Sequence, residues 1–121
     1  MLISQGKPEE VFVLREFNVL IDIEKLIGAI NRNSIKYLFE PMDISEIECC
    51  VRSDIIEKIH IENMCLNRSN EPIIITTLGD KDRIIDGNHR FVKRKNDGFN
   101  SCKVVYIEQS ELKEFIEQFQ H

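Results

Sequence analysis

The segment from residue 72 to residue 98 constrains the fold more than any other part of the chain. It reads "PIIITTLGDKDRIIDGNHRFVKRKNDG", in which two runs rich in β-branched residues are joined by a short connection at residues 79–81. A glycine in such a connection predicts a β-hairpin. Gly87 follows the second run as a turn residue, and "NHRFVKRKND" then predicts a helix that ends at Gly98. The segment therefore predicts a strand, a hairpin, a second strand, a glycine turn and a helix, in that order.

The first half of the chain carries weaker signals. "EVFVLREFNVLIDIEKLIGAIN" begins with the alternation of a strand and continues with apolar residues at helical spacing. We expect a strand and then a helix that Asp22 caps and that ends near residues 31–33. "IKYLFEPMDI" predicts a strand broken by Pro41, whose nitrogen cannot donate a hydrogen bond to a neighbouring strand. Ser53 is the expected N-cap of a second helix, "DIIEKIHIENMCL", which ends at the turn "NRSNEP".

The last part of the chain predicts one more strand and one more helix. "CKVVYI" has the composition of a strand, and Ser110 is placed to cap the helix "ELKEFIEQF". The apolar residues of that helix share one face: Leu112, Phe115, Ile116 and Phe119. Because 121 residues without repeats or linkers suit one core, we expect a single α+β domain over residues 1–121, with a small mixed sheet and flanking helices.

Composition excludes several classes of protein. The net charge of −5 argues against an extended nucleic-acid surface, because such surfaces belong to basic domains. No apolar run approaches the roughly 20 residues that span a bilayer, so we expect no membrane association. The start of the chain, "MLISQGKPEE", does not have the pattern of a secretory signal, which favours the cytoplasm.

Cysteines and isolated carboxylates offer no clear site. The four cysteines have neither the spacing of a zinc site nor the density of a disulfide scaffold, so we expect reduced, mostly buried thiols and no metal centre: Cys49, Cys50, Cys65 and Cys102. Four glutamates outside residues 86–90 are available as acids or bases, but we expect them to be solvated surface groups: Glu40, Glu46, Glu48 and Glu71.

Residues 86–90, "DGNHR", are the strongest candidate for a functional site. The first N–H groups of a helix lie at the positive end of its macrodipole, and a glycine there lets an anion approach closely. We expect a phosphate group, to which His89 donates a hydrogen bond or a proton and Arg90 a charge-assisted contact. Asp86 either caps the helix or acts on a metal ion or a hydroxyl. Purely structural roles are the alternative for these residues: turn formation, capping, packing and a surface cation.

The succession "EPIIITTLGDKDRIIDGNHRFVKRKNDGFNSCKVVYI" resembles the conserved portion of the ParB/sulfiredoxin-like superfamily, in its Asp-Gly-x-His-Arg variant. The likeness extends over roughly residues 40–107, with an N-terminal segment and a C-terminal helix as additions. Members of this superfamily include CTP-binding partition proteins, ATP-dependent sulfiredoxins and free-serine kinases. By position, the resemblance implies that Gly87, Asn88, His89 and Arg90 hold the phosphates of ATP or CTP with Mg²⁺, and that His89 and Asp86 are catalytic.

Departures from the family pattern narrow the function. Sulfiredoxins place a catalytic cysteine where this chain has Asn88, which argues against sulfinic acid reduction. The chain also lacks the length and basic surface of DNA-binding partition proteins. One hypothesis is therefore nucleotide or phosphate binding at residues 87–90, with phosphoryl transfer as its extension. The other is a non-catalytic acidic immunity protein or antitoxin that neutralises a basic toxin, such as a nuclease, because an acidic pI of about 5.2 suits a basic partner.

Overall fold

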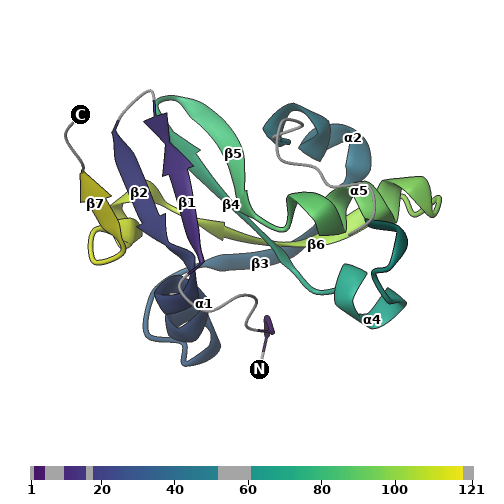
Figure 1. Ribbon diagram of the computed structural model, residues 1–121, viewed down its shortest axis with the longest axis horizontal. Helices are drawn as coiled ribbons and strands as arrows, with labels where there is room; N and C mark the ends of the chain where they lie inside the picture. The colour runs from purple at the N-terminus through teal and green to yellow at the C-terminus, as the bar shows by residue number, and fades with distance from the viewer. Residues whose placement is uncertain (1, 5–9, 16–17, 52–60, 119–121) are drawn as a thin grey trace.

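The computed structural model describes residues 2–4, 10–15, 18–51 and 61–118 (Figure 1). These residues form an α+β structure with two small sheets. The first sheet is antiparallel and has the order β1 (Val11–Leu14), β2 (Val19–Asp22) and β7 (Ile116–Gln118). The second sheet has the order β3 (Leu38–Asp43), β6 (Ser101–Ile107), β4 (Ile73–Leu78) and β5 (Lys81–Asp86).

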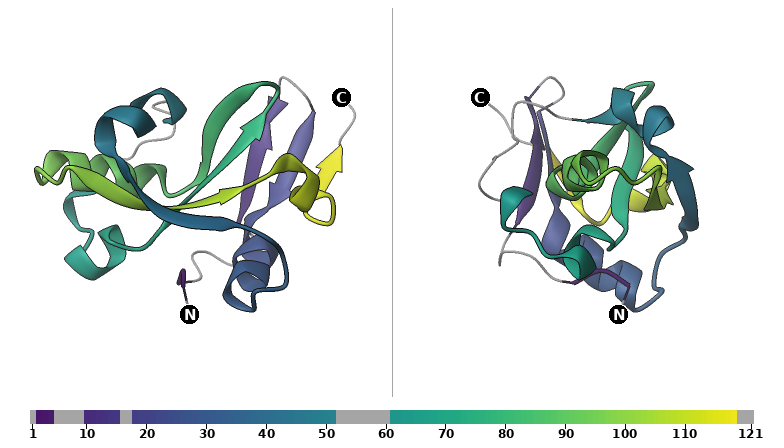
Figure 2. Two further views of the ribbon diagram at one scale, coloured as in Figure 1. Left: turned by 180° about the vertical axis from the view of Figure 1, so that it is seen from behind. Right: turned by 90° about the vertical axis from the view of Figure 1, so that its right-hand side faces the viewer.

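Short helices flank these sheets. They are α1 (Ile23–Asn31), α2 (Ile44–Ile47), α4 (Leu66–Ser69) and α5 (Asn88–Asn96), with the 3₁₀ turns η2 (Glu48–Cys50) and η4 (Gln109–Leu112). Figure 2 shows α5 between α2 and α4, at the end of the molecule away from the first sheet. In the described part of the chain, no helix combines the length and apolar character that crossing a bilayer requires.

The hairpin and the helix ends follow the sequence prediction. Gly79 and Asp80 form the two-residue turn between β4 and β5, with φ of 60° and 63°, as a type I′ turn requires. Asp22 caps α1, since its Oδ1 accepts a hydrogen bond from the Lys25 backbone N–H at 3.0 Å. Helix α5 ends at Asn96, and the predicted Gly98 follows it with a φ of 84°, which allows backbone hydrogen bonds back to the last turn of the helix.

The prediction of a C-terminal helix is wrong. Residues 109–112 form the turn η4, and residues 116–118 form strand β7, which pairs with β2 in the register Ile21↔Ile116. Leu112 and Phe115 are buried in the core at a spacing of three residues, which a 3₁₀ turn satisfies as well as an α-helix does. The open edge of β2 then supplies backbone partners for the next residues, and a strand forms there.

The structure differs from three further predictions. The single strand expected before α1 is a hairpin of two strands, β1 and β2. Strand β3 continues through Pro41 without a break, because β3 lies at the edge of its sheet and, among the described strands, pairs with β6 alone. Part of the turn expected at residues 67–72 is the short helix α4. The helix expected after Ser53 falls mostly on residues 52–60, which lie outside the described residues.

Strand β4 separates two apolar cores. Ile74 packs into the core that α1, β1 and β2 cover, whereas Ile73 and Ile75 face the core that contains Phe91 of α5 and Ile47 of α2. Both faces of β4 are therefore buried, as its near-continuous apolar run indicates. Strands β4 and β6 are parallel, so the chain must cross between them, and it does so through β5 and α5. This crossover places the turn at residue 87 beside the start of β4.

Candidate phosphate-binding turn

The turn between β5 and α5 is built around Gly87. Its φ of 101° and ψ of 18° lie in the left-handed region, and it is the N-cap residue of α5. A Cβ atom at this position would lie 2.6 Å from Cγ2 of Ile73 and 2.9 Å from Nη2 of Arg90. Both the backbone conformation and the close approach to β4 therefore require glycine.

Arg90 and Asp86 form a buried ion pair beneath this turn. The side chain of Arg90 is 3% exposed and that of Asp86 is 7% exposed, and Nη2 of Arg90 lies 2.9 Å from Oδ2 of Asp86. The same nitrogen donates a hydrogen bond of 2.8 Å to the backbone carbonyl of Pro72. The guanidinium thus joins the end of β5, the start of α5 and the residue that precedes β4. The Nε atom of Arg90 is also buried and has no hydrogen-bond partner among the described residues.

Asn88 and His89 complete the predicted set of five residues. Asn88 is buried, and its Nδ2 donates to the backbone carbonyl of Ile84 in β5 at 3.3 Å. His89 is half-buried. The structure therefore brings all five predicted residues together at one turn, but it orients them unequally. The side chains of Asp86, Asn88 and Arg90 face the interior, and the imidazole of His89 is the most exposed side chain of the group.

The other basic residues of α5 take part in structural contacts. Arg94 donates to the backbone carbonyl of Ser101 at 2.9 Å and to Oδ1 of Asn70 at 3.1 Å, and its guanidinium lies 4.0 Å from the centre of the Phe99 ring. Lys93 pairs with Asp97, and Lys95 pairs with Glu48. No acidic residue lies in the first turn of α5. These contacts tie the helix to the neighbouring elements.

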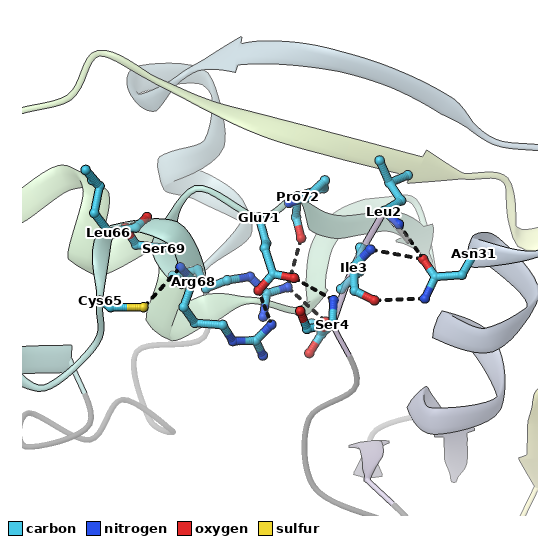
Figure 3. Close-up of polar contacts among 12 residues, drawn as sticks. Leu2, Ile3, Ser4, Asn31, Cys65, Leu66, Arg68, Ser69, Glu71 and Pro72 are labelled. Atoms are coloured by element: carbon cyan, nitrogen blue, oxygen red, sulfur yellow. Dashed lines mark hydrogen bonds and ion pairs between the residues drawn. The ribbon is translucent and has the colours of Figure 1, made fainter.

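Glu71 has a structural role that the sequence did not indicate. Figure 3 shows its carboxylate between the Arg68 guanidinium, at 2.8 Å, and the Ser4 backbone N–H, at 2.5 Å. Partial burial acts to raise the pKa of Glu71, but the hydrogen bonds from Arg68 and Ser4 outweigh it, so the pKa lies below its ordinary value. The expectation of a solvated surface carboxylate is wrong for Glu71, whose side chain is 19% exposed.

The N-terminal segment is held close to this network. The side chain of Asn31, at the end of α1, accepts hydrogen bonds from the backbone N–H groups of Leu2 and Ile3 and donates one of 2.8 Å to the Ile3 carbonyl (Figure 3). The side chain of Ile3 is fully buried in the core that α1, β1 and β2 cover. Residues 2–4 therefore connect α1 to Glu71, the neighbour of Pro72. Sequence reasoning missed Asn31 and Arg68, since nothing local marks a side chain whose partners are distant in the chain.

The three comparisons with known proteins add no evidence on this site. Comparison with protein families, with curated proteins and with solved structures found no match. The geometry of residues 86–90 is therefore the basis for the functional argument.

Proposed function

We propose that the turn at residues 87–89 binds a phosphate group of a nucleotide such as ATP or CTP, together with Mg²⁺. The observation that supports this proposal is the buried pair of Arg90 and Asp86 beneath the turn. Removing two charges from water costs several kcal/mol per ion, so the pair is weak evidence for stability, and we infer that it fixes the geometry of the turn. At this position the pair holds the turn in one geometry against the Pro72 carbonyl, and a preorganised turn binds an anion without further ordering cost.

The proposal assigns different roles to the five residues. Gly87 sets the turn that leads into α5, so that the positive end of the helix dipole faces the proposed phosphate site. The imidazole of His89 supplies a hydrogen-bond donor to a phosphate oxygen. Arg90 and Asp86 act as positioning residues, because Nη2 of Arg90 and Oδ2 of Asp86 already bond to one another, and Nη2 also bonds to the Pro72 carbonyl. Phosphoryl transfer is an extension of this proposal, in which His89 assists by proton transfer and the turn stabilises negative charge.

Calorimetric titration tests the proposal. We expect ATP or CTP with Mg²⁺ to bind the wild-type chain with micromolar affinity. His89→Ala should weaken binding about 10- to 100-fold, because one charge-assisted hydrogen bond contributes on the order of 1.5–3 kcal/mol. Lys95→Ala is the matched control, since it removes a positive charge from the opposite end of α5. Absence of binding by the wild type, or equal weakening in both variants, argues against the proposal.

One observation favours the second candidate, a non-catalytic protein that binds a basic toxin. Edge strand β3 exposes two large apolar side chains, Leu38 at 63% and Phe39 at 48%, next to the exposed carboxylate of Glu40. Exposed apolar side chains on a strand that also carries negative charge suit a basic protein surface. We expect a salt-sensitive complex with such a toxin that Phe39→Ser weakens and His89→Ala leaves intact. Binding that is insensitive to both salt and Phe39→Ser counts against this function.

A further inference from the structure

Two adjacent thiols lie at the end of the segment that follows β3. Cys49 and Cys50 belong to η2, and their sulfur atoms are 3.8 Å apart. Cys49 is exposed, and its thiol lies 3.7 Å from the backbone carbonyl of Glu46, which can accept its hydrogen bond. Cys50 is 5% exposed and packs in the core that also contains Phe91. The pair thus has one thiol at the surface and one just beneath it.

A disulfide between these two residues is unfavourable. Consecutive Cα atoms are about 3.8 Å apart across a trans peptide, whereas disulfides usually join Cα atoms about 4.4–6.8 Å apart. Closing the S–S bond would also shorten the present sulfur separation of 3.8 Å to about 2.0 Å. A single atom that bridges both sulfurs requires less movement, since it leaves the sulfurs well beyond bonding distance of one another. The pair is therefore better suited to chelation than to oxidation.

The number of ligands selects the species that the pair can chelate. Among the residues that the structure describes, no group of three or more His, Cys, Asp or Glu side chains is arranged to hold a metal ion. Zinc sites need three or four protein ligands, which two thiols do not supply. A trivalent arsenic centre that carries one organic group needs two sulfurs only, and thiols are the soft ligands that such a centre prefers.

We propose that Cys49 and Cys50 form a dithiol site for monosubstituted trivalent arsenicals. The arsenic–oxygen double bond of an organoarsine oxide and two S–H bonds break, two As–S bonds form, and the oxygen leaves as water with both protons. Arsenic stays trivalent, so no oxidant or reductant is needed. The exposed Cys49 reacts first, and the nearby Cys50 then closes the ring within the protein.

The environment of Cys50 is consistent with this order. Burial, followed by its interaction with the Cys49 thiol, raises the pKa of Cys50 to about 12. Cys50 therefore stays protonated at neutral pH and is a poor nucleophile towards reagents in solution. Once arsenic is attached to Cys49, the second thiol meets it at a high effective concentration, and ring closure no longer depends on an encounter in solution.

Phenylarsine oxide is the probe for this site. The reduced, folded full-length chain is incubated with one equivalent, exposed to a large excess of a monothiol, and analysed by intact mass. We expect one phenylarsenic group per chain that resists the monothiol and that a small dithiol removes. Cys49→Ser and Cys50→Ala should each retain the group about 100-fold less well, because each variant loses the second As–S bond. Cys65→Ser is the matched control, since it removes the other exposed thiol.

Each outcome has a distinct meaning. Circular dichroism of every variant establishes that it is folded, and Cys49→Ser changes a surface residue, so the test does not depend on the buried Cys50 alone. Loss of the adduct in Cys65→Ser would place the chelate between Cys49 and Cys65 and overturn the proposal. Displacement of the adduct from the wild type by the monothiol would do the same, as would an adduct that forms after denaturation only.

Discussion

Replacing Gly87 with alanine should destabilise the fold more than the same change at any exposed turn. A left-handed backbone costs an L-residue about 1–2 kcal/mol. The new Cβ would also lie 2.6 Å from Cγ2 and 2.9 Å from Cβ of Ile73, which is 1% exposed in β4 and cannot move aside freely. Such overpacking costs about 1–3 kcal/mol, so the two effects together predict a loss of about 2–5 kcal/mol in the free energy of unfolding.

Urea unfolding followed by circular dichroism measures this loss, and Gly98→Ala is the matched control. Gly98 also has a positive φ, of 84°, but a Cβ atom there would have no atom within 4 Å. We therefore expect Gly98→Ala to cost the conformational term alone, about 1–2 kcal/mol. Equal losses in the two variants, at similar slopes of free energy against urea, would falsify the close packing of the turn against β4.

Two further predictions concern charged side chains: the Arg90–Asp86 ion pair and the Glu71 carboxylate. Arg90→Ala should lower the free energy of unfolding by about 3–5 kcal/mol in urea titrations, because it leaves the Asp86 carboxylate buried without its partner. The double variant Arg90→Ala with Asp86→Asn should recover part of that loss, and no recovery would contradict the coupling of the two residues. The lowered pKa of Glu71 contributes stability that is present above its ordinary value of 4.5 and is lost as pH falls through the folded-state pKa. Glu71→Gln should therefore be less stable than wild type at neutral pH, with a gap that narrows below pH 4.5 in urea titrations; a constant gap would refute this linkage.

Local sequence determined the features that depend on neighbouring residues. The hairpin turn at Gly79 and Asp80, the cap at Asp22 and the glycine turn at Gly98 after α5 all involve positive φ angles or hydrogen bonds within a few residues. Such features are written in short stretches of sequence, because residue type restricts the backbone directly. The grouping of Asp86, Gly87 and their three successors at one turn follows for the same reason, since they are consecutive.

Tertiary structure decided what those residues face. Residues 116–118 join a sheet because the edge of β2, nearly 100 positions earlier, is open to them, and helical spacing alone could not reveal that partner. Arg90 is buried because the carbonyl of Pro72 and the carboxylate of Asp86 meet it in the interior, although its local sequence also suited a surface cation. The sequence by itself thus determined the hairpin turn at residues 79–80, the cap of α1 and the glycine turns at residues 87 and 98. Pairing and burial between distant segments, which depend on the whole packed chain, determined which strands form and which charges face solvent.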